Sequence, residues 1–241
     1  MFETKIPRTR HGRVMHELGI EIIRGDFVEN SLLPSDAELQ QRFQVSRTVL
    51  REVLKTLAAK GLVLARAKVG TRILERQFWN LFDPDILYWH AAAGVDSKFL
   101  YHLSEIRLAL EPEAAALAAE RKTDAQLQRL YDHVDKMADS RSFAADFVDA
   151  DLGFHITIAE ASGNPLMRSI SSLIEVALAI TFTISSPLPN TVQHSRTVAR
   201  HRAIADAIKF GDTDAARGAM RAVIREGLDR VAAEVSGETV E

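Results

Sequence analysis

The 241-residue chain contains no cysteine and no apolar run long enough to cross a membrane. Without cysteine it forms no disulfides, zinc fingers, iron–sulfur clusters or thiol nucleophiles, so any metal must use His and carboxylate ligands. A membrane helix needs about 18 apolar residues, and residues 1–13 are polar and basic without the apolar core of a signal peptide. We therefore expect a cytoplasmic protein that makes no membrane contact.

Charge is unevenly distributed along the chain. The formal net charge is −3, yet residues 1–75 hold 13 Lys and Arg against 9 Asp and Glu, a net of +4. Residues 76–241 hold 17 against 24, a net of −7. A DNA-binding module can be attached to an acidic partner domain, although a modest basic excess more often only solvates a surface. The division indicates two parts of different function, and a motif must decide what the first part binds.

The N-terminal segment has the signals of three short helices followed by a hairpin. Apolar residues first recur at helical spacing, and Ser35 and Glu38 then have the spacing of a capping box. Ser46 can cap a third helix, which Gly61 ends. Two short β-compatible runs follow, on either side of a basic turn that ends in Gly70.

The third helix and the hairpin carry exposed basic side chains. Burial of the apolar face of this helix turns Arg47, Thr48 and Arg51 toward solvent near its N-terminal end, where a recognition helix meets the major groove. An arginine fork can bind O6 and N7 of guanine together. Lys68 and Arg72 in the hairpin can contact phosphates or the minor groove. Each feature alone favours a merely solvated basic surface, whereas their order and spacing together favour DNA binding.

This segment resembles the GntR family of transcriptional regulators. The residues that carry the resemblance are Gly25-Asp26-Phe27, Leu33-Pro34-Ser35-Asp36, Phe43 to Arg47, Val49 to Leu54, Leu57, Gly61-Leu62-Val63 and Gly70-Thr71. The resemblance implies a winged helix-turn-helix over residues 1–75. The candidate DNA-contacting residues are Ser46, Arg47, Thr48, Arg51, Lys68 and Arg72. Asp36 replaces the usual Glu of the family, and Ala37 stands where some members have a DNA-contacting Arg, so operator preference can differ.

One winged helix reads few base pairs of double-stranded DNA. Paired half-sites one helical turn or more apart would mirror a two-fold protein. We therefore expect a homodimer bound to a palindromic operator.

Residues 76–97 predict a connector with aromatic anchors, because the segment is too apolar for a flexible linker. A signal between two sites needs an element whose arrangement both sites bias. We expect Trp79 or Trp89 to rest on the helix that carries Arg107 and to transmit such a signal.

Helical periodicity without any strand pattern extends over residues 98–235 and predicts a bundle of about six helices. Pro112 should begin or kink the first of them. Residues 236–241 form a tail. The expected fold is mainly α, with a winged helix-turn-helix followed by an all-α bundle.

Asp151 and His155 are four residues apart on one predicted helix and can share a partner. Spacing alone favours an ion pair or a satisfied core histidine. The residues around them, Asp151 to His155 and Ala161 to Pro165, resemble the FCD domain, the helical effector domain of the FadR subfamily, as do Arg107, Glu111, His201, Ala207-Ile208 and Gly211-Asp212. The resemblance spans roughly residues 98–232.

The FCD resemblance implies a metal site. Asp151, His155 and His201 match three of its four metal-binding positions, and Val223 stands at the fourth. Because valine cannot bind metal, the site has weak metal affinity, a fourth ligand from water or effector, or no metal at all. Two imidazoles and one carboxylate suit Zn²⁺, Ni²⁺, Mn²⁺ or Fe²⁺ alike.

The resemblance also implies a small carboxylate effector, which would bind Arg107 through its guanidinium fork. The alternative for Arg107 is a helix salt bridge with Glu111. The candidate effector-binding residues are Arg107, Asp151, His155, Asn164 and His201. The connector and cavity pattern is similar to regulators of sugar-acid catabolism, which implies a repressor released by a hydroxylated acid such as an aldonate.

Two other functions remain as alternatives. In a metal-responsive regulator the ion itself would be the signal, and the missing fourth ligand counts against it. In a metal-dependent hydrolase or lyase the same three residues would hold a catalytic ion. No further general base is evident beside them, and the DNA-binding segment would have no purpose, so the sequence favours a regulator that is not an enzyme.

Overall fold

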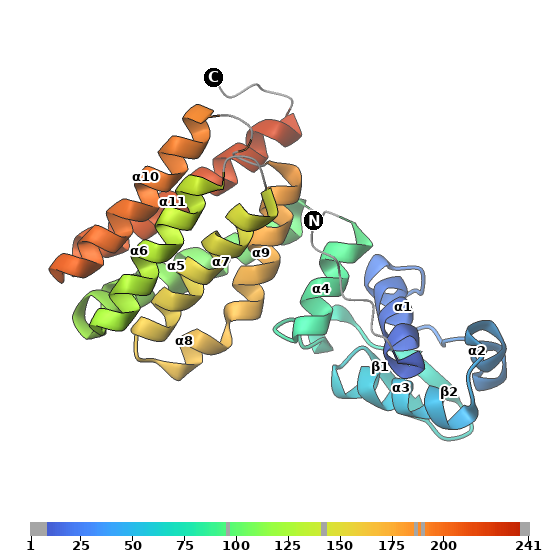
Figure 1. The fold of residues 1–241 in the computed structure, drawn as a ribbon. Coiled ribbons are helices and arrows are strands. Elements are labelled where there is room, and N and C mark those ends of the chain that lie inside the picture. The colour runs from blue at the N-terminus through green and yellow to red at the C-terminus, as the bar shows by residue number, and fades with distance from the viewer. Residues whose placement is uncertain (1–8, 95–96, 141–143, 186–187, 189–190, 237–241) are drawn as a thin grey trace. The chain divides into compact units, whose positions relative to one another are not determined.

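The computed structural model describes residues 9–94, 97–140, 144–185, 188 and 191–236. The chain divides into two compact units, one ending at Asp96 and the other beginning at Ser97. The first contains α1 (Arg10–Arg24), α2 (Asp36–Phe43), α3 (Arg47–Ala59), β1 (Val63–Arg66), β2 (Gly70–Ile73), the 3-10 turn η1 (Arg76–Phe78) and α4 (Pro84–Ala93) (Figure 1). The second contains α5 (Ser97–Arg121), α6 (Asp124–Asp139), α7 (Ala144–Ala161), α8 (Pro165–Ser169), α9 (Ser171–Ile184), α10 (Thr191–Phe210) and α11 (Thr213–Ser236).

The N-terminal unit confirms the predicted three helices and hairpin. The capping box of α2 is complete, because the backbone N–H of Glu38 donates to Ser35 Oγ and the Glu38 carboxylate accepts from the backbone N–H of Ser35. Antiparallel pairing of β1 with β2 runs from Val63 opposite Ile73 to Arg66 opposite Gly70. The result is the helix-turn-helix with a two-stranded wing.

Both tryptophans of the predicted connector belong to the core of the N-terminal unit. Trp79 and Trp89 are buried with residues of α1 and α3, and α4 packs along α1. The Nε1–H of Trp79 donates to the Leu74 carbonyl at 3.0 Å, and the Nε1–H of Trp89 lies 3.1 Å from His16 Nδ1. Both rings are therefore part of the core of the first unit, where we had expected one of them to rest on the helix of Arg107.

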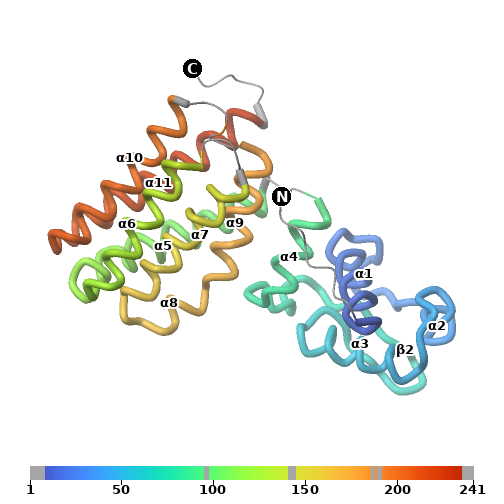
Figure 2. Tube along the Cα trace, in the orientation of Figure 1, coloured from blue at the N-terminus to red at the C-terminus, as the bar shows by residue number. Residues whose placement is uncertain are grey.

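The second unit is all-helical, as predicted. Its long helices α5 and α11 pack along each other, as do α6 and α7, and α10 packs on α11 and α6 (Figure 2). Helix α5 continues through Pro112, so the alternative in which Pro112 begins a helix is wrong. Most of the predicted break at residues 187–190 and most of the tail at 236–241 lie outside the described residues. Within the described ranges, no helix combines the length and apolarity that a bilayer crossing requires.

Close packing of α1 on α4 generates a first prediction. A Cβ added at Gly19 would lie 2.5 Å from Trp89 Cε3, so Gly19→Ala must push the two helices apart. We expect a loss of about 1–3 kcal/mol in unfolding free energy, although alanine is the better helix former. Gly218→Ala in α11 meets no atom within 4 Å and should raise stability by up to about 1 kcal/mol. Urea unfolding followed by circular dichroism measures both, and a Gly19→Ala protein of unchanged stability would contradict this packing.

A candidate DNA-reading surface and a buried Asp-His-His cluster

Helix α3 is built to present its N-terminal turn to a ligand. Ser46 Oγ accepts from the backbone N–H of Val49 at 3.3 Å, which fixes the first turn. The opposite face of the helix is buried through Leu50, Val53, Leu54 and Leu57. Arg47, Thr48 and Arg51 are consequently exposed. The predicted orientation of these three side chains is confirmed, whereas the hydroxyl of Ser46 is already used in the cap.

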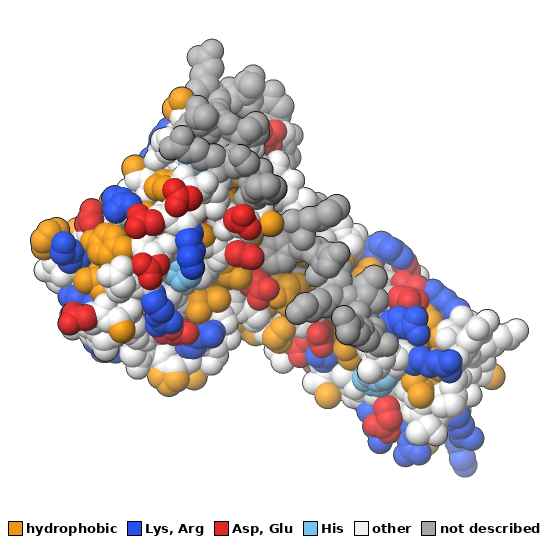
Figure 3. Space-filling model, in the orientation of Figure 1, with side chains coloured by type: hydrophobic (Ala, Val, Ile, Leu, Met, Phe, Trp, Pro, Cys, Tyr) orange, Lys and Arg blue, Asp and Glu red, His pale blue; other side chains and the backbone are white. Residues whose placement is uncertain are grey.

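The two basic residues of the wing have different surroundings. Lys68 is exposed at the hairpin turn, with a positive φ of 62°. Arg72 is half-buried, and its Nη1 donates to the Asn30 carbonyl at 2.7 Å. Arg72 therefore ties the wing to the loop before α2, while Lys68 is available to a phosphate. Figure 3 shows several Lys and Arg side chains at the surface of this unit, as well as on the helical unit (Figure 3).

The second candidate site is a buried cluster in the helical unit. Asp151 and His155 come from α7 and His201 from α10, and all three side chains are almost fully buried. One potential ligand atom from each lies within 4.8 Å of the others. The expected convergence of these three residues is therefore observed.

The atoms that converge are those without hydrogen-bond partners. Among the described residues, Asp151 Oδ1, His155 Nε2 and His201 Nε2 are all buried and unsatisfied. His201 Nε2 approaches Asp151 Oδ1 to 2.7 Å, but the two groups are not aligned as a hydrogen bond. A buried polar atom without a partner is costly and usually marks a site for an ion or water.

The other nitrogen of each imidazole is held from behind. His155 Nδ1 contacts the Glu111 carboxylate, and His201 Nδ1 lies 2.8 Å from the Thr197 carbonyl. Phe154 packs edge-on against both rings. Support of this kind fixes the tautomer and leaves Nε2 free to coordinate, as second-layer partners do around metal-binding histidines.

Opposite charges compensate the buried carboxylates. Burial alone would raise the pKa of Glu111, but Arg107 and His155 lower it to about 2. Burial likewise opposes ionisation of Asp151, and the histidines, His201 foremost, lower its pKa to about 2. Burial lowers the pKa of His201, yet Asp151 outweighs it, so this pKa is raised above its usual value. The Asp151 carboxylate therefore favours a positive charge beside it.

Arg107 lies in the same cavity, and both sequence-based interpretations of it have support. It lines the cavity with the Asp-His-His cluster, and its Nε donates to Glu111 Oε1 at 2.5 Å. Arg107, Glu111 and His155 thus form one continuous buried chain. The cavity has about 30 Å³ of space for the centres of water molecules, which is room for an ion and water but not for a sugar acid.

Two expected positions have different outcomes. Val223 lines the cavity, where the fourth ligand was expected, and offers only methyl groups. Asn164 does not line it; its Oδ1 accepts from the backbone N–H of Leu166 and begins α8. Asn164 is therefore a helix cap, because an Asn followed by Pro at the first helical position is a strong N-cap signal.

Sequence reasoning missed three further polar groups of the cavity. Thr197 Oγ1 and Arg230 Nε are buried and have no hydrogen-bond partner among the described residues, and Glu226 lies beside them. Thr197 is one helical turn before His201, so spacing could have indicated it. Arg230 and Glu226 come from α11, and the packing of α11 on α5 and α10 brings them here.

Comparison with known proteins identifies the family of both units. The model of the gntR family of bacterial regulatory proteins matches residues 10–73, and the FCD domain model matches residues 102–226. The galactonate operon transcriptional repressor of Escherichia coli K12 is 30% identical over 219 residues, which cover 91% of this chain and 95% of that protein. This chain belongs to the GntR family. It is a ligand-responsive transcriptional regulator with an FCD domain, of the FadR subfamily, and not an enzyme.

Two other proteins resemble this GntR regulator over most of its length. The uncharacterized HTH-type transcriptional regulator YieP of Escherichia coli K12 is 35% identical and covers 87% of this chain and 90% of its own. The solved structure of Lar from Listeria monocytogenes has a TM-score of 0.65 at 20% identity, over 94% of this chain and 98% of that chain. The likeness to Lar shows the shared fold alone.

Compensation of Glu111 generates a second prediction, on acid stability. Its pKa is about 2 in the folded protein and ordinarily 4.5, so the unfolded chain takes up the proton first as pH falls. The stabilisation, about 3 kcal/mol at neutral pH, is fully present above about pH 4.5 and is lost toward pH 2. Glu111→Gln should be less stable than wild type at neutral pH, and the gap should narrow at about pH 3 in urea titrations. The exposed Glu105→Gln in α5 is the control, and a gap for Glu111→Gln that stays constant with pH would contradict the compensation.

Proposed function

We propose that this GntR regulator is a repressor that leaves its operator when a small carboxylate, such as a sugar acid, binds beside Asp151, His155 and His201. The observation that carries the proposal is the convergence of three buried, unsatisfied ligand atoms next to an arginine. The E. coli relative's name as a galactonate operon repressor supports repression and this class of ligand.

The Asp-His-His cluster fits a divalent cation. Its three atoms lack hydrogen-bond partners and lie within 4.8 Å of one another, and each imidazole is held through its other nitrogen. Zn²⁺, Ni²⁺, Mn²⁺ and Fe²⁺ all accept such a donor set. Because Val223 offers no donor, the remaining position falls to water or to an oxygen of the effector. A bound cation would polarise that oxygen and orient the acid in the cavity.

The effector would be held by charge and by hydroxyl groups. Arg107 supplies the fork for a carboxylate. Thr197 Oγ1, which lines the cavity and has no hydrogen-bond partner among the described residues, would bind a hydroxyl of the acid. The cavity is too small for a sugar acid as it stands, so binding must move its walls. This movement would couple ligand binding to the rest of the bundle.

The chain from Arg107 through Glu111 to His155 is the element that would change. A carboxylate drawn onto Arg107 competes with Glu111, which then binds only His155. Arg107 and Glu111 lie on α5, and His155 on α7, so a shift in this pairing moves α5 against α7. Such a pairing would have two discrete arrangements, as transmission between sites requires.

At the other end, Arg47, Thr48 and Arg51 would read base edges in the major groove, with Ser46 fixing the first turn of α3. Lys68 would contact the backbone, and Arg72 would hold the wing in place. Homodimerisation would match paired half-sites of a palindromic operator. A protein that binds a bacterial operator acts in the cytoplasm.

A metal-responsive regulator is the second candidate. The cavity, with about 30 Å³ for water centres, already admits an ion but not an acid. In that case metal alone would change operator affinity. The acid sensor is preferred because Arg107 and Thr197 contribute nothing to metal coordination and yet line the same cavity.

DNA reading generates a third prediction. Arg51→Ala should cost about 1–3 kcal/mol of specific operator binding, because a bidentate base contact is lost. Lys55→Ala, an exposed cation one turn further along the same helix, should change it little. Lys68→Ala should weaken all DNA sequences alike and lower the slope of log K against log salt by about 1. Fluorescence anisotropy at fixed salt measures each variant, and unchanged affinity in both Arg47→Ala and Arg51→Ala would refute the placement of α3.

Effector binding generates a fourth prediction, tested by titrating the operator complex with galactonate and other hexonates in gel shifts. Wild type should release DNA at micromolar to millimolar acid. Arg107→Lys, which keeps the charge beside Glu111 but loses the fork, should need at least about tenfold more acid. The surface variant Arg129→Lys should behave as wild type.

Metal dependence is read in the same titration. Chelated wild type and His201→Ala should respond less to acid but bind operator normally, while the exposed His102→Ala should keep the full response. An undiminished response after chelation would reject the metal requirement but would be consistent with an acid sensor. Release by metal without acid would favour the metal-responsive regulator, and no response to any hexonate in wild type would refute sugar-acid sensing.

A further inference from the structure

An arginine-rich groove of about 690 Å³ lies between α10 and α11, outside the buried cluster. Its charged lining residues are Arg196, Arg200, Arg221, Arg225 and Arg230, with Glu226 and Asp229. Five positive charges against two are a local excess, since residues 76–241 carry a net charge of −7. A concave surface of one sign concentrates ions of the opposite sign and raises their rate of capture.

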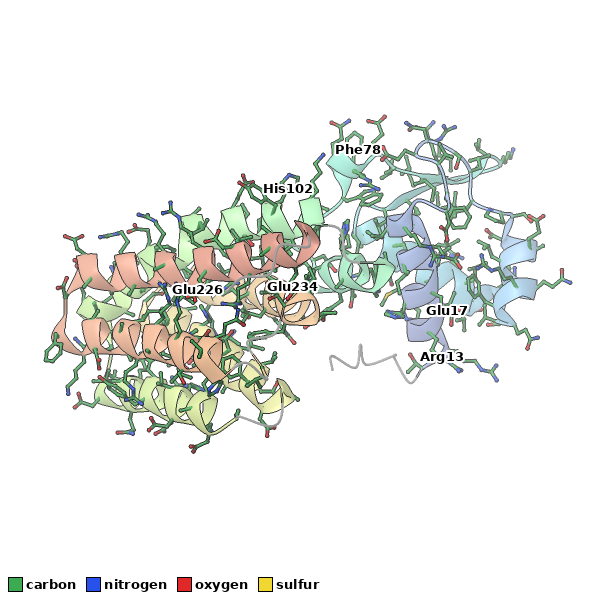
Figure 4. The ribbon with its side chains drawn as sticks, turned by 90° about the horizontal axis from the view of Figure 1, so that it is seen from above. Arg13, Glu17, Phe78, His102, Glu226 and Glu234 are labelled. Carbon is green, nitrogen blue, oxygen red and sulfur yellow. The ribbon has the colours of Figure 1, made fainter. Side chains whose placement is uncertain are left out.

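The groove and the buried cavity share a wall. Arg200, Glu226 and Arg230 line both of them. Glu226 Oε1 pairs with Arg196 Nε at 3.1 Å, and its other oxygen pairs with Arg200 Nε. Figure 4 shows Glu226 on α11, where it lies beside α10 (Figure 4). One carboxylate, held by two arginines of the facing helix, therefore lies in the wall between the groove and the cavity.

We propose that this groove is an anion-binding vestibule of the buried cavity, in which Glu226 occupies the place of the incoming carboxylate. A ligand carboxylate has the same chemistry as the Glu226 side chain and can replace it on Arg196 and Arg200. The exchange conserves the number of ion pairs. It also displaces the wall of a cavity that is otherwise too small for an acid.

The surroundings of Glu226 make the exchange easy. The side chain of Arg196 is 61% exposed and that of Arg200 is 33% exposed, so their ion pairs are weakly held and screened by salt. Arg230, whose Nε has no hydrogen-bond partner among the described residues, lies further in and offers the next positive charge. The carboxylate class of the ligand rests on the proposed function, whereas the closure by Glu226 does not.

The test measures access to the cluster by acylating histidines of the full-length, chelated protein with diethyl pyrocarbonate. Peptide mass spectrometry gives the rates at His155 and His201, with the exposed His102 as internal reference. Rates are compared on the alkaline plateau, where the imidazoles are neutral, so that altered protonation does not count as altered access. In wild type, His155 and His201 should react far more slowly than His102.

Glu226→Gln keeps the shape of the side chain and removes its charge. It should raise the plateau rates at His155 and His201 about fivefold. A partly exposed ion pair shifts the equilibrium between a closed and an open form by about this factor. Arg196→Gln should act in the same direction. Glu160→Gln is the matched control, because Glu160 also bridges two arginines, Arg129 and Arg168, but lines neither the groove nor the cavity.

Three outcomes would overturn the vestibule: wild-type rates in Glu226→Gln, an equal increase in Glu160→Gln, or cluster histidines that react as fast as His102 in wild type. Zinc added to wild type reports on the proposed metal site separately. Protection of His155 and His201 by zinc supports that site. Lack of protection by zinc rejects the metal site. The vestibule is then still tested by the effect of Glu226→Gln on the acylation rates.

Discussion

A carboxylate buried in an apolar bundle must be compensated, and the placement of Glu111 is the constraint on which the site depends. One of its oxygens accepts from Arg107 Nε, and the other contacts His155 Nδ1. The single carboxylate of Glu111 therefore both compensates the charge of Arg107 and fixes the tautomer of His155. As a result, His155 Nε2 stays free, whereas the guanidinium of Arg107 is already paired. Removal of Arg107 or Glu111 would leave an uncompensated buried charge. The free-energy cost of that charge is far larger than the net stabilisation that the intact pair provides.

Hydrogen bonds within the N-terminal unit likewise determine which of its polar side chains remain without a partner. Ser46 uses its hydroxyl to fix the first turn of α3, and the exposed residues that follow it keep their polar atoms for a ligand. Arg72 donates one of its N–H groups to the Asn30 carbonyl. Proximity to the expected DNA surface is therefore not a sufficient criterion for a contact, because groups already satisfied within the protein serve as support.

Local signals in the sequence predict most of the fold. Capping boxes, helical periodicity and glycine stops depend on neighbouring residues, and the three N-terminal helices follow from them. Asp151 and His155 share a face because they are four residues apart, but His201 joins them only through the packing of α10, which family resemblance supplied and spacing did not. The contact of Glu111 with His155 and the burial of Trp89 join distant elements, so periodicity alone could not place them. Asn164 was assigned to the effector by resemblance, although its own N-cap signal explains it.

Val223 is best understood by counting charge in the buried cavity. With a divalent cation bound, Asp151 and two neutral imidazoles would leave one positive charge at the ion. Glu111 neutralises Arg107 and Glu226 pairs with Arg200, so Arg230 adds to the positive excess of the cavity. A histidine at position 223 would add a donor without changing that sum, so valine removes a ligand and keeps the excess charge. An isolated charge in a low-dielectric site is strongly unfavourable. Under the proposed function, a carboxylate that completed the coordination and cancelled the charge would gain more here than at a site whose protein ligands are complete, and Val223 would tie the affinity of the acid to the presence of the metal.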